Sequence, residues 1–427
     1  MIKRFYFERA MSYAMKSSYL AELKMHQRNS KKELAEIQLK RLRKIIRHAY
    51  EHVPYYRDLF DREKINSESI KKLEDLQKIP ITTKKDIQAN YDKIFSNSIE
   101  KYEILTTTGS TGIPLNIYND RKSHFYSEAL LLYAFSEAGL RLRDRFVEIS
   151  AITEQSNLLD KNFRFFRRDE ISLYNSMEKI IEMLKKYKPD AIYTFPSVLR
   201  TMSHFLDNEV HLKPRLIFTH GETLTESCRE TINSAFGAKI MNTYGSTEFN
   251  RLAFECEEHS GLHMITDCSV IDFVKDGENV GSGCEGEIIV TGLYNYKMPL
   301  IRYGLGDIGI PTDEKCSCGR NWPLIKSIEG RSDDYLILPS GKVISPRNIN
   351  VIEGIPGIIQ YRTIQERKDR FVVLIIPDKD FSFETEKKIK EKINLGCLGE
   401  NINIEIRLVD EIPRERTGKL KTIISKI

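Results

Sequence analysis

The feature that most constrains the fold is a regular alternation of short β-rich runs and longer helical stretches in the middle of the chain. These runs and stretches occupy, in order, residues 145–152, 176–187, 191–195, 215–221, 225–236 and 239–245. Strands that alternate with helices are typical of a mixed α/β sheet with helices on its faces. The sequence therefore predicts an α/β fold.

The length of the chain predicts more than one packed unit. A chain of 427 residues exceeds what a single hydrophobic core usually serves. The sequence pattern changes near residues 331–334, after which a β-rich run, a charged helix and a second β-rich run follow. We predict a large α/β domain at 1–330, with mixed sheets and a helical N-terminal region. A small α+β domain is predicted at 331–427.

Composition excludes several classes of protein. The chain is 41% hydrophobic and 30% charged, as expected of a globular protein and not of a disordered one. A net charge of +5 over a mixed surface argues against a nucleic-acid-binding protein. No apolar run reaches the roughly 18 residues of a membrane span, and the N-terminus lacks the apolar block of a signal peptide. We therefore expect a cytoplasmic protein, in which seven cysteines do not form a disulfide framework.

A polar glycine loop follows the apolar fragment at 103–105. It contains Thr108, Gly109, Ser110, Thr111 and Gly112. Flexible glycines expose backbone N–H groups, and with neighbouring hydroxyls these can hold a polyphosphate; a polar surface turn would have the same composition. The chain has no GxxxxGK[ST] loop. Its two GxGxxG strings, at Gly281 and Gly304, do not precede helices, so dinucleotide binding is not expected.

Four later segments carry single residues suited to nucleotide chemistry. Glu248 follows a tight turn after the run at 239–245, at the carboxyl end where open α/β sheets bind ligands. Asp307 lies in a glycine-framed loop and could accept hydrogen bonds from a sugar diol. Arg331 stands beside an acidic pair, and Lys419 follows a glycine near the C-terminus. Each segment alone is a weak signal, but all five in this order are specific.

This ordered set resembles the adenylate-forming superfamily of acyl-CoA synthetases, luciferases and adenylation domains. Within the superfamily it is similar to phenylacetate-CoA ligases and their capsule-locus homologues. The likeness extends from about Arg41 to the C-terminus and includes HAYEHVPYYRDLF and LEDLQKIPITTKKDI. It implies ATP-dependent activation of a carboxylic acid to an acyl-adenylate, release of pyrophosphate, and transfer to CoA or to an amine. A polysaccharide or secondary-metabolite pathway is the implied setting.

The resemblance assigns the nucleotide side of the site. It implies that the loop from Thr108 to Gly112 grips the phosphates and that Glu248 holds Mg²⁺. Asp307 would take the ribose hydroxyls, supported by Arg302 and Arg331. The turn beside the adenine comprises Tyr244, Gly245, Ser246 and Thr247.

The resemblance also assigns the moving side of the site. Asp333 matches the hinge about which the small domain rotates between half-reactions. Lys419 matches the lysine that bridges the acyl carboxylate and the α-phosphate. Positive charge at this place would stabilise the pentavalent transition state, in which two negatively charged partners meet.

Some of the cysteines form a candidate metal site. Cys316 and Cys318 form a tight knuckle, and Cys256 lies near His259 and His263. Three thiols and one imidazole would complete a tetrahedral structural zinc site. The spacing alone leaves this open, but some members of the resembled subgroup carry a comparable cluster. We select His263 over His259 because GLH matches the subgroup. The remaining cysteines are predicted to be small core residues: Cys228, Cys268, Cys284 and Cys397.

The residues expected around the acyl group are informative about the acid. They are His220, Gly221, Glu222, Phe249, Asn250 and Arg251. Polar Asn250 and Arg251 argue against phenylacetate and favour a polar or charged acid, although Arg251 facing solvent is the alternative.

The expected ligands are therefore ATP, Mg²⁺, structural Zn²⁺, a carboxylic acid, and CoA or an amine; a homodimer is left open. The alternative is a catalytically silent homologue that serves as a nucleotide-binding or assembly module. The presence of Glu248, Asp307 and Lys419 favours the enzyme.

Overall fold

The computed structural model describes residues 2–107, 114–151, 167–206 and 212–427. The predicted phosphate loop from Thr108 to Gly112 lies outside these described residues. The chain forms two compact units, each built from two stretches. The first unit comprises 1–138 and 243–328, and the second comprises 139–242 and 329–427.

The helical start of the first unit follows from its caps and its apolar periodicity. Ser30 caps helix α2 (Lys31–His52) in a capping box with Glu33, which satisfies backbone N–H groups that the first turn cannot. The helix ends at His52 because Pro54 follows, and Pro54 then begins α3 (Pro54–Glu63). These helices are α1 (Ile2–His26), α2, α3, α4 (Lys84–Ala89) and α5 (Arg121–Glu137), with 3₁₀ turns at Leu73–Lys78 and Tyr91–Lys93.

The strands of the first unit form a hairpin and part of a large sheet. The hairpin pairs β1 (Tyr102–Thr106) with β2 (Asn116–Asp120) in antiparallel register. The sheet order is β11-β10-β12-β13-β14-β9-β8-β7. Its strands are β7 (Lys239–Ser246), β8 (Asn250–Glu255), β9 (Leu262–Met264), β10 (Ser269–Lys275), β11 (Glu278–Asn279), β12 (Gly286–Gly292), β13 (Tyr303–Thr312) and β14 (Leu324–Arg331).

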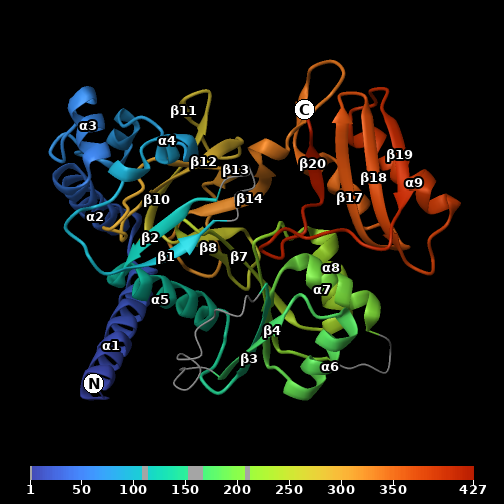
Figure 1. Ribbon diagram of the computed structural model, residues 1–427, viewed down its shortest axis with the longest axis horizontal. Helices are drawn as coiled ribbons and strands as arrows, with labels where there is room; N and C mark the ends of the chain where they lie inside the picture. The colour runs from blue at the N-terminus through green and yellow to red at the C-terminus, as the bar shows by residue number, and fades with distance from the viewer. Residues whose placement is uncertain (1, 108–113, 152–166, 207–211) are drawn as a thin grey trace. The chain divides into compact units, whose positions relative to one another are not determined.

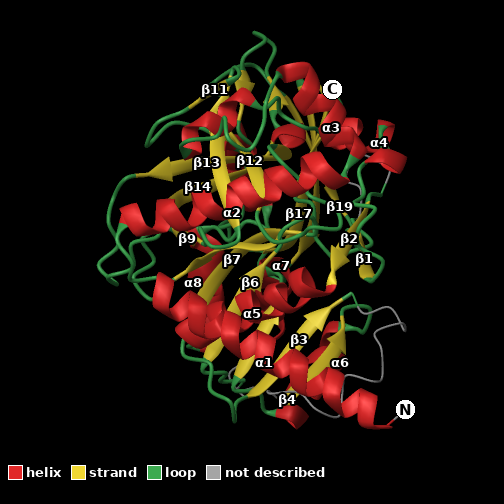
Figure 2. Cartoon of the chain, turned by 90° about the vertical axis from the view of Figure 1, so that its left-hand side faces the viewer, coloured by secondary structure: helices red, strands yellow, loops and turns green. Residues whose placement is uncertain are grey.

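Helix α2 covers this sheet and closes the core of the first unit (Figure 2). Its apolar face is buried with strand residues such as Ile288 and Val290. Gln38 also donates to the carbonyl of Ser269 at the start of β10, over 2.8 Å. Helix α2 is therefore an amphipathic core helix whose polar face remains outside.

The second unit begins with a parallel sheet in the order β6-β5-β3-β4. Strands β5 and β6 are mostly apolar and buried because amphipathic helices shield them, and residues from the sheet and the helices form one core. Figure 1 shows these helices in green beside β3 and β4. The elements are β3 (Arg145–Ser150), β4 (Arg167–Ser172), α6 (Met177–Tyr187), β5 (Ala191–Thr194), α7 (Pro196–Phe205), β6 (Leu216–His220) and α8 (Glu226–Phe236).

The C-terminal stretch adds a four-stranded sheet, in the order β19-β18-β17-β20, with its own core. Its strands and helix are β17 (Ile358–Arg367), β18 (Arg370–Pro377), α9 (Phe383–Gly396), β19 (Asn403–Leu408) and β20 (Ile423–Ser425). A short pair, β15 (Leu336–Ile337) with β16 (Val343–Ile344), precedes it, as do 3₁₀ turns at Ser332–Asp334, Pro346–Asn348 and Asn350–Ile352.

The predicted α/β class is confirmed, including the helical N-terminal region and the small α+β C-terminal part. The domain boundary at 330/331 stays a prediction, since the two compact units each combine separate stretches of chain. Cys284 was wrongly predicted as a core residue: it is exposed, whereas Cys228, Cys268 and Cys397 are buried. Among the described residues, no helix is both long and apolar enough to cross a membrane.

Candidate active site

A tight turn at the end of β7 presents Glu248 in the first unit. Strands β7 and β8 pair on either side of this turn, with a register shift at Gly245. A side chain at Gly245 would place its Cβ 1.9 Å from the carbonyl oxygen of Asn250, so only glycine fits. Asn250 itself adopts a left-handed φ of 58°, which asparagine tolerates better than most residues. The conformation of the YGSTE turn therefore depends on glycine at position 245 and is tolerated by asparagine at position 250.

Two of the predicted nucleotide-binding residues meet in this unit. The Tyr244 hydroxyl donates to Oδ2 of Asp307 over 2.8 Å, joining the end of β7 to the middle of β13. Arg251, in contrast, donates to the hydroxyl of Thr243 over 3.1 Å. The structure thus brings Tyr244 and Asp307 together, and their roles at the adenine and the ribose stay predictions.

In the second unit, Lys419 lies over the backbone of Gly221. A Cβ at Gly221, where φ is +74°, would lie 3.1 Å from Cε of Lys419 and 2.9 Å from the ring of Phe195. A Cβ at Gly418, where φ is +84°, would lie 2.5 Å from Leu173. Both glycines are therefore needed for the lysine loop to approach the end of β6.

The carboxylate of Glu222 holds the loop that carries Lys419. Its Oε1 accepts from the backbone N–H of Leu420 over 2.6 Å and from the Ser197 hydroxyl over 3.0 Å, and its Oε2 accepts from the Ser197 N–H over 2.9 Å. Arg414 lies 3.8 Å from the carboxylate and donates to the Gly418 carbonyl over 3.0 Å. Burial raises the pKa of Glu222, while Arg414 and the N–H donors oppose that rise.

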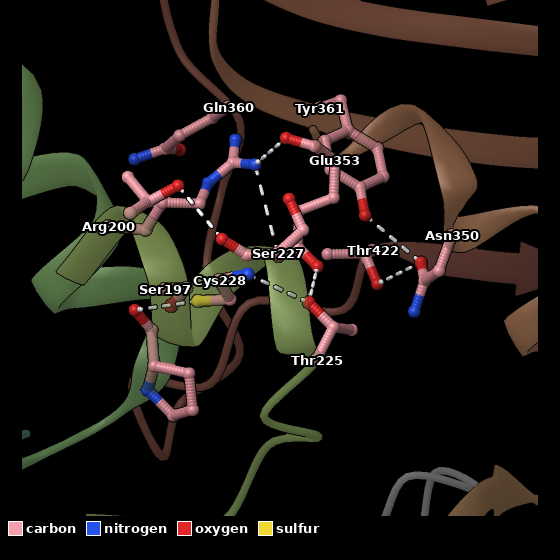
Figure 3. Close-up of polar contacts among 12 residues, drawn as sticks. Ser197, Arg200, Thr225, Ser227, Cys228, Asn350, Glu353, Gln360, Tyr361 and Thr422 are labelled. Carbon is pink, nitrogen blue, oxygen red and sulfur yellow. Dashed lines mark hydrogen bonds and ion pairs between the residues drawn. The ribbon is translucent and has the colours of Figure 1, made fainter. Parts of the chain in front are cut away.

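A polar network joins α7 and α8 to the C-terminal stretch that carries Lys419 (Figure 3). Arg200 on α7 donates to the carbonyls of Glu353 and Ile359, over 3.2 and 2.6 Å. The Thr225 hydroxyl, at the start of α8, donates to the Glu353 carboxylate. Asn350 accepts from the Tyr361 hydroxyl over 3.1 Å. These contacts hold the C-terminal stretch against α7 and α8 within the second unit.

A compact group of metal-ligating side chains occupies the first unit. The ligand atoms of Cys256, His263, Cys316 and Cys318 all lie within 4.8 Å of one another. Sγ of Cys256 is 3.4 Å from Sγ of Cys316 and 3.3 Å from Nε2 of His263, which is 3.4 Å from Sγ of Cys318. Tetrahedral zinc with Zn–S bonds of about 2.3 Å needs ligands roughly 3.5 Å apart, so the four residues fit the ion. His259 instead contacts Glu255 at 3.1 Å.

Comparisons with known proteins agree with this geometry. A family model described as an AMP-binding enzyme matches residues 166–298, and one described as the CapK C-terminal domain matches 336–426. Protein CapK of Staphylococcus aureus is 24% identical over 413 residues, which cover 92% of this chain and 90% of that protein. The phenylacetate-coenzyme A ligase of Thermus thermophilus is 27% identical over 355 residues, or 79% of each chain. The chain belongs to the adenylate-forming superfamily.

A solved member of this superfamily shares the fold. A crystal structure of 2-hydroxyisobutyryl-CoA ligase in the postadenylation state aligns with a TM-score of 0.81 at 19% identity. The alignment covers 94% of this chain and 91% of that one. At this identity the match supports the fold alone, and the chemistry depends on the residues described above.

Other residues assigned by the adenylate-forming resemblance have contacts that do not test their roles. Arg302, buried and with a φ of +47°, donates to the carbonyls of Gln77 and Ile79 over 2.8 and 2.7 Å. Arg331 lies 3.4 Å from Asp333 at the 3₁₀ turn Ser332–Asp334. The roles of Arg302 and Arg331 at the ribose, and of Asp333 as a hinge, stay predictions.

Sequence reasoning missed the residues that hold Lys419 in place. Ser197 and Arg414 both contact Glu222. Ser197 lies outside the segments that the superfamily pattern singles out, and Arg414 begins the RERTGK segment but had no role assigned to it. Glu222 was predicted to line the acyl site; its carboxylate is engaged by the lysine loop, and the substrate role stays a prediction. One signal was available in the sequence: Arg414 in RERTGK is a charged residue, for which a buried acidic partner could have been expected.

Proposed function

We propose that this protein is an AMP-forming carboxylate–CoA ligase. A carboxylate oxygen of the acid attacks the α-phosphorus of ATP, the bond to the β-phosphate bridging oxygen breaks, and pyrophosphate leaves. The CoA sulfur then attacks the acyl carbon of the adenylate, its thiol proton is lost, and AMP leaves. Of the two acceptors considered, CoA is favoured by the relatives named as CoA ligases.

The observation that carries the proposal is the position of Lys419. Its side chain crosses Gly221 at the carboxyl end of β6, and Glu222 holds the next backbone N–H. The end of a parallel strand is where such sheets bind ligands. A cation fixed there can stabilise charge that builds up on the α-phosphate without reorganising during the reaction. At Gly221 the absence of a side chain leaves room for this approach.

Two metal ions fit the proposal. Glu248, at the tip of its turn, would hold Mg²⁺, which neutralises phosphate charge when bound. Cys256, His263, Cys316 and Cys318 would hold a structural Zn²⁺, supported by the mutual distances of their ligand atoms. That group ties the start of the β8–β9 connection to the segment before β14, so its effect is on the stability of the first unit.

The test is ATP–pyrophosphate exchange with a panel of carboxylic acids, followed by detection of acyl-CoA when CoA is added. Lys419→Ala should abolish most of the exchange, whereas the matched control Lys379→Ala, an exposed lysine, should not. Acid-dependent exchange with no acyl-CoA would favour the amine acceptor. The absence of exchange with every acid, while ATP still binds, would favour the catalytically silent homologue.

A further inference from the structure

A small cavity in the first unit adjoins the turn that carries Glu248. Glu248, Phe249 and Asn250 line one side of it, and Asn119 at the end of β2, residues of α5, Cys268 and the 292–295 segment line the rest. Its volume is about 40 Å³, compared with the roughly 10–15 Å³ that one water needs on the same measure. The cavity therefore has room for a few atoms only.

Aromatic side chains limit the cavity to this size. Tyr126 and Tyr294 stack with their ring centroids 3.5 Å apart and their planes within 6°. On another side, the ring of Phe249 packs over Gly292, whose Cβ would lie 3.2 Å from it. Tyr126 is 2% exposed. Displacing such a close-packed side chain to enlarge the cavity would cost free energy. The cavity is therefore smaller than the roughly 150 Å³ cavity that holds a benzene ring.

The lining presents two side-chain amides, Asn295 and Asn119, whose orientation the neighbouring contacts determine. Oδ1 of Asn295 accepts from the backbone N–H groups of Lys297 and Met298, over 3.2 and 3.3 Å. Its Nδ2 therefore donates, and it does so to the Tyr118 carbonyl and to Oδ1 of Asn119, over 2.9 and 3.2 Å. Asn119 must then direct its oxygen toward Asn295.

This orientation leaves Nδ2 of Asn119 without an acceptor. Asn119 is 4% exposed, and its Nδ2 is buried with no hydrogen-bond partner in the described part of the chain. An amide donor left unpaired inside a protein is costly, and Asn119 borders the cavity. An acceptor oxygen placed in the cavity would satisfy it.

We propose that this cavity receives the chain of a small carboxylic acid that bears a hydroxyl or carbonyl oxygen, and that Asn119 selects for that oxygen. This inference rests on the proposed ligase function. The acid is therefore a short hydroxy or oxo acid, and an aryl acid such as phenylacetate is excluded by size. Asn119 acts as a specificity-determining residue, because a hydrocarbon chain of equal length would leave its donor unpaired.

The experiment measures kcat/KM for ATP–pyrophosphate exchange with acids matched in size. Propionate is compared with glycolate, lactate, 3-hydroxypropionate and pyruvate, and phenylacetate tests the volume limit. We expect the best oxygenated acid to exceed propionate roughly 10- to 100-fold and phenylacetate to be inert. Asn119→Asp keeps the shape and the acceptor toward Asn295 but removes the donor. It should therefore reduce the preference for pyruvate, whose carbonyl oxygen can only accept, to about threefold or less. Asn279→Asp, at an exposed asparagine, is the matched control.

Asn119→Leu is a second variant that removes the polar group altogether and should move the preference in the same direction. If propionate or phenylacetate equals the oxygenated acids, or if both Asn119 variants keep the wild-type preference, the inference is overturned while the ligase function stands. If no acid supports exchange, the proposed function falls and this inference falls with it.

Discussion

Replacing Glu222 by glutamine tests how Lys419, the proposed catalytic lysine, is held. The carboxylate accepts from two backbone N–H groups, those of Leu420 and Ser197, one on each oxygen. A glutamine has a single acceptor oxygen. One of the two N–H groups must therefore face the new NH₂, donor against donor, and Arg414 loses its counter-charge.

The size of the effect follows from these contacts. Losing one charge-assisted hydrogen bond and leaving its donor unpaired costs about 1.5–3 kcal/mol. The cost falls on the arrangement in which the Lys419 loop is docked. If adenylation needs that arrangement, Glu222→Gln should slow it roughly 10- to 150-fold. ATP affinity should change little, since Tyr244 and Asp307 are untouched.

The assay separates the two half-reactions. Adenylation is followed by pyrophosphate release, and the second step by capture of presynthesised acyl-adenylate by CoA. Capture should stay within a few-fold of wild type. Glu230→Gln, at an exposed position on helix α8, which follows Glu222 in the chain, should affect neither step. An equal loss in both half-reactions, or no loss in either, would refute the positioning role.

The pH dependence provides an independent check. Burial raises the pKa of Glu222 above the usual glutamic acid value. As the pH falls through this raised pKa, the carboxylate gains a proton and can no longer accept from both N–H groups. Adenylation by the wild type should therefore decline at a higher pH than an ordinary glutamate would cause. Glu222→Gln should lack that acid-side decline, measured with pyrophosphate release across the pH range.

Three further predictions concern the catalytic lysine, the metal and the hinge. Lys419→Ala should slow adenylation roughly 10²- to 10³-fold, or about 3–4 kcal/mol, yet spare the capture of presynthesised adenylate; loss of both steps would mean that the lysine holds the fold. Protein purified without added metal should contain about one zinc per chain, and Cys316→Ser should lower both the zinc content by elemental analysis and the melting temperature. Unchanged zinc content and melting temperature would contradict the proposed zinc site. Asp333→Pro should preserve one half-reaction and cripple the other, and equal loss of both would eliminate the hinge assignment.

Much of the fold was predictable because local pattern and tertiary environment agree. Strands β3, β5 and β6 are apolar runs, and helices α6 and α8 carry apolar residues at helical spacing, so periodicity located all five. Strand β4 was not predicted. Its sequence, RRDEIS, is largely charged, and what makes it a strand is its parallel pairing with β3. Such pairing depends on the sheet and not on the residues of the strand alone.

The candidate site divides in the same way. Glu248, Asp307, Gly418 and Lys419 stand in short motifs that a reader can find in the sequence. The partners that set their geometry do not, because a hydrogen bond between Glu222 and Leu420 leaves no local trace in either segment. The unpaired Nδ2 of Asn119 was even harder to predict from the sequence, because it follows only from the hydrogen bonds that Asn295 makes.

The same contacts explain how a held lysine could also be released. The apolar core around α6, α7 and α8 is separate from the core of the C-terminal sheet. What joins the two is largely polar: Arg200 on the carbonyls of Glu353 and Ile359, and Glu222 on the lysine loop. A hydrogen bond exchanged for water costs only about 0.5–1.5 kcal/mol net, whereas separating a hydrophobic interface costs about 25 cal/mol for every Å² exposed. An interface made of polar contacts can orient Lys419 while it is closed. Its separation costs little free energy, so it can open once per turnover. This suits the rotation predicted at Asp333 better than an apolar interface would.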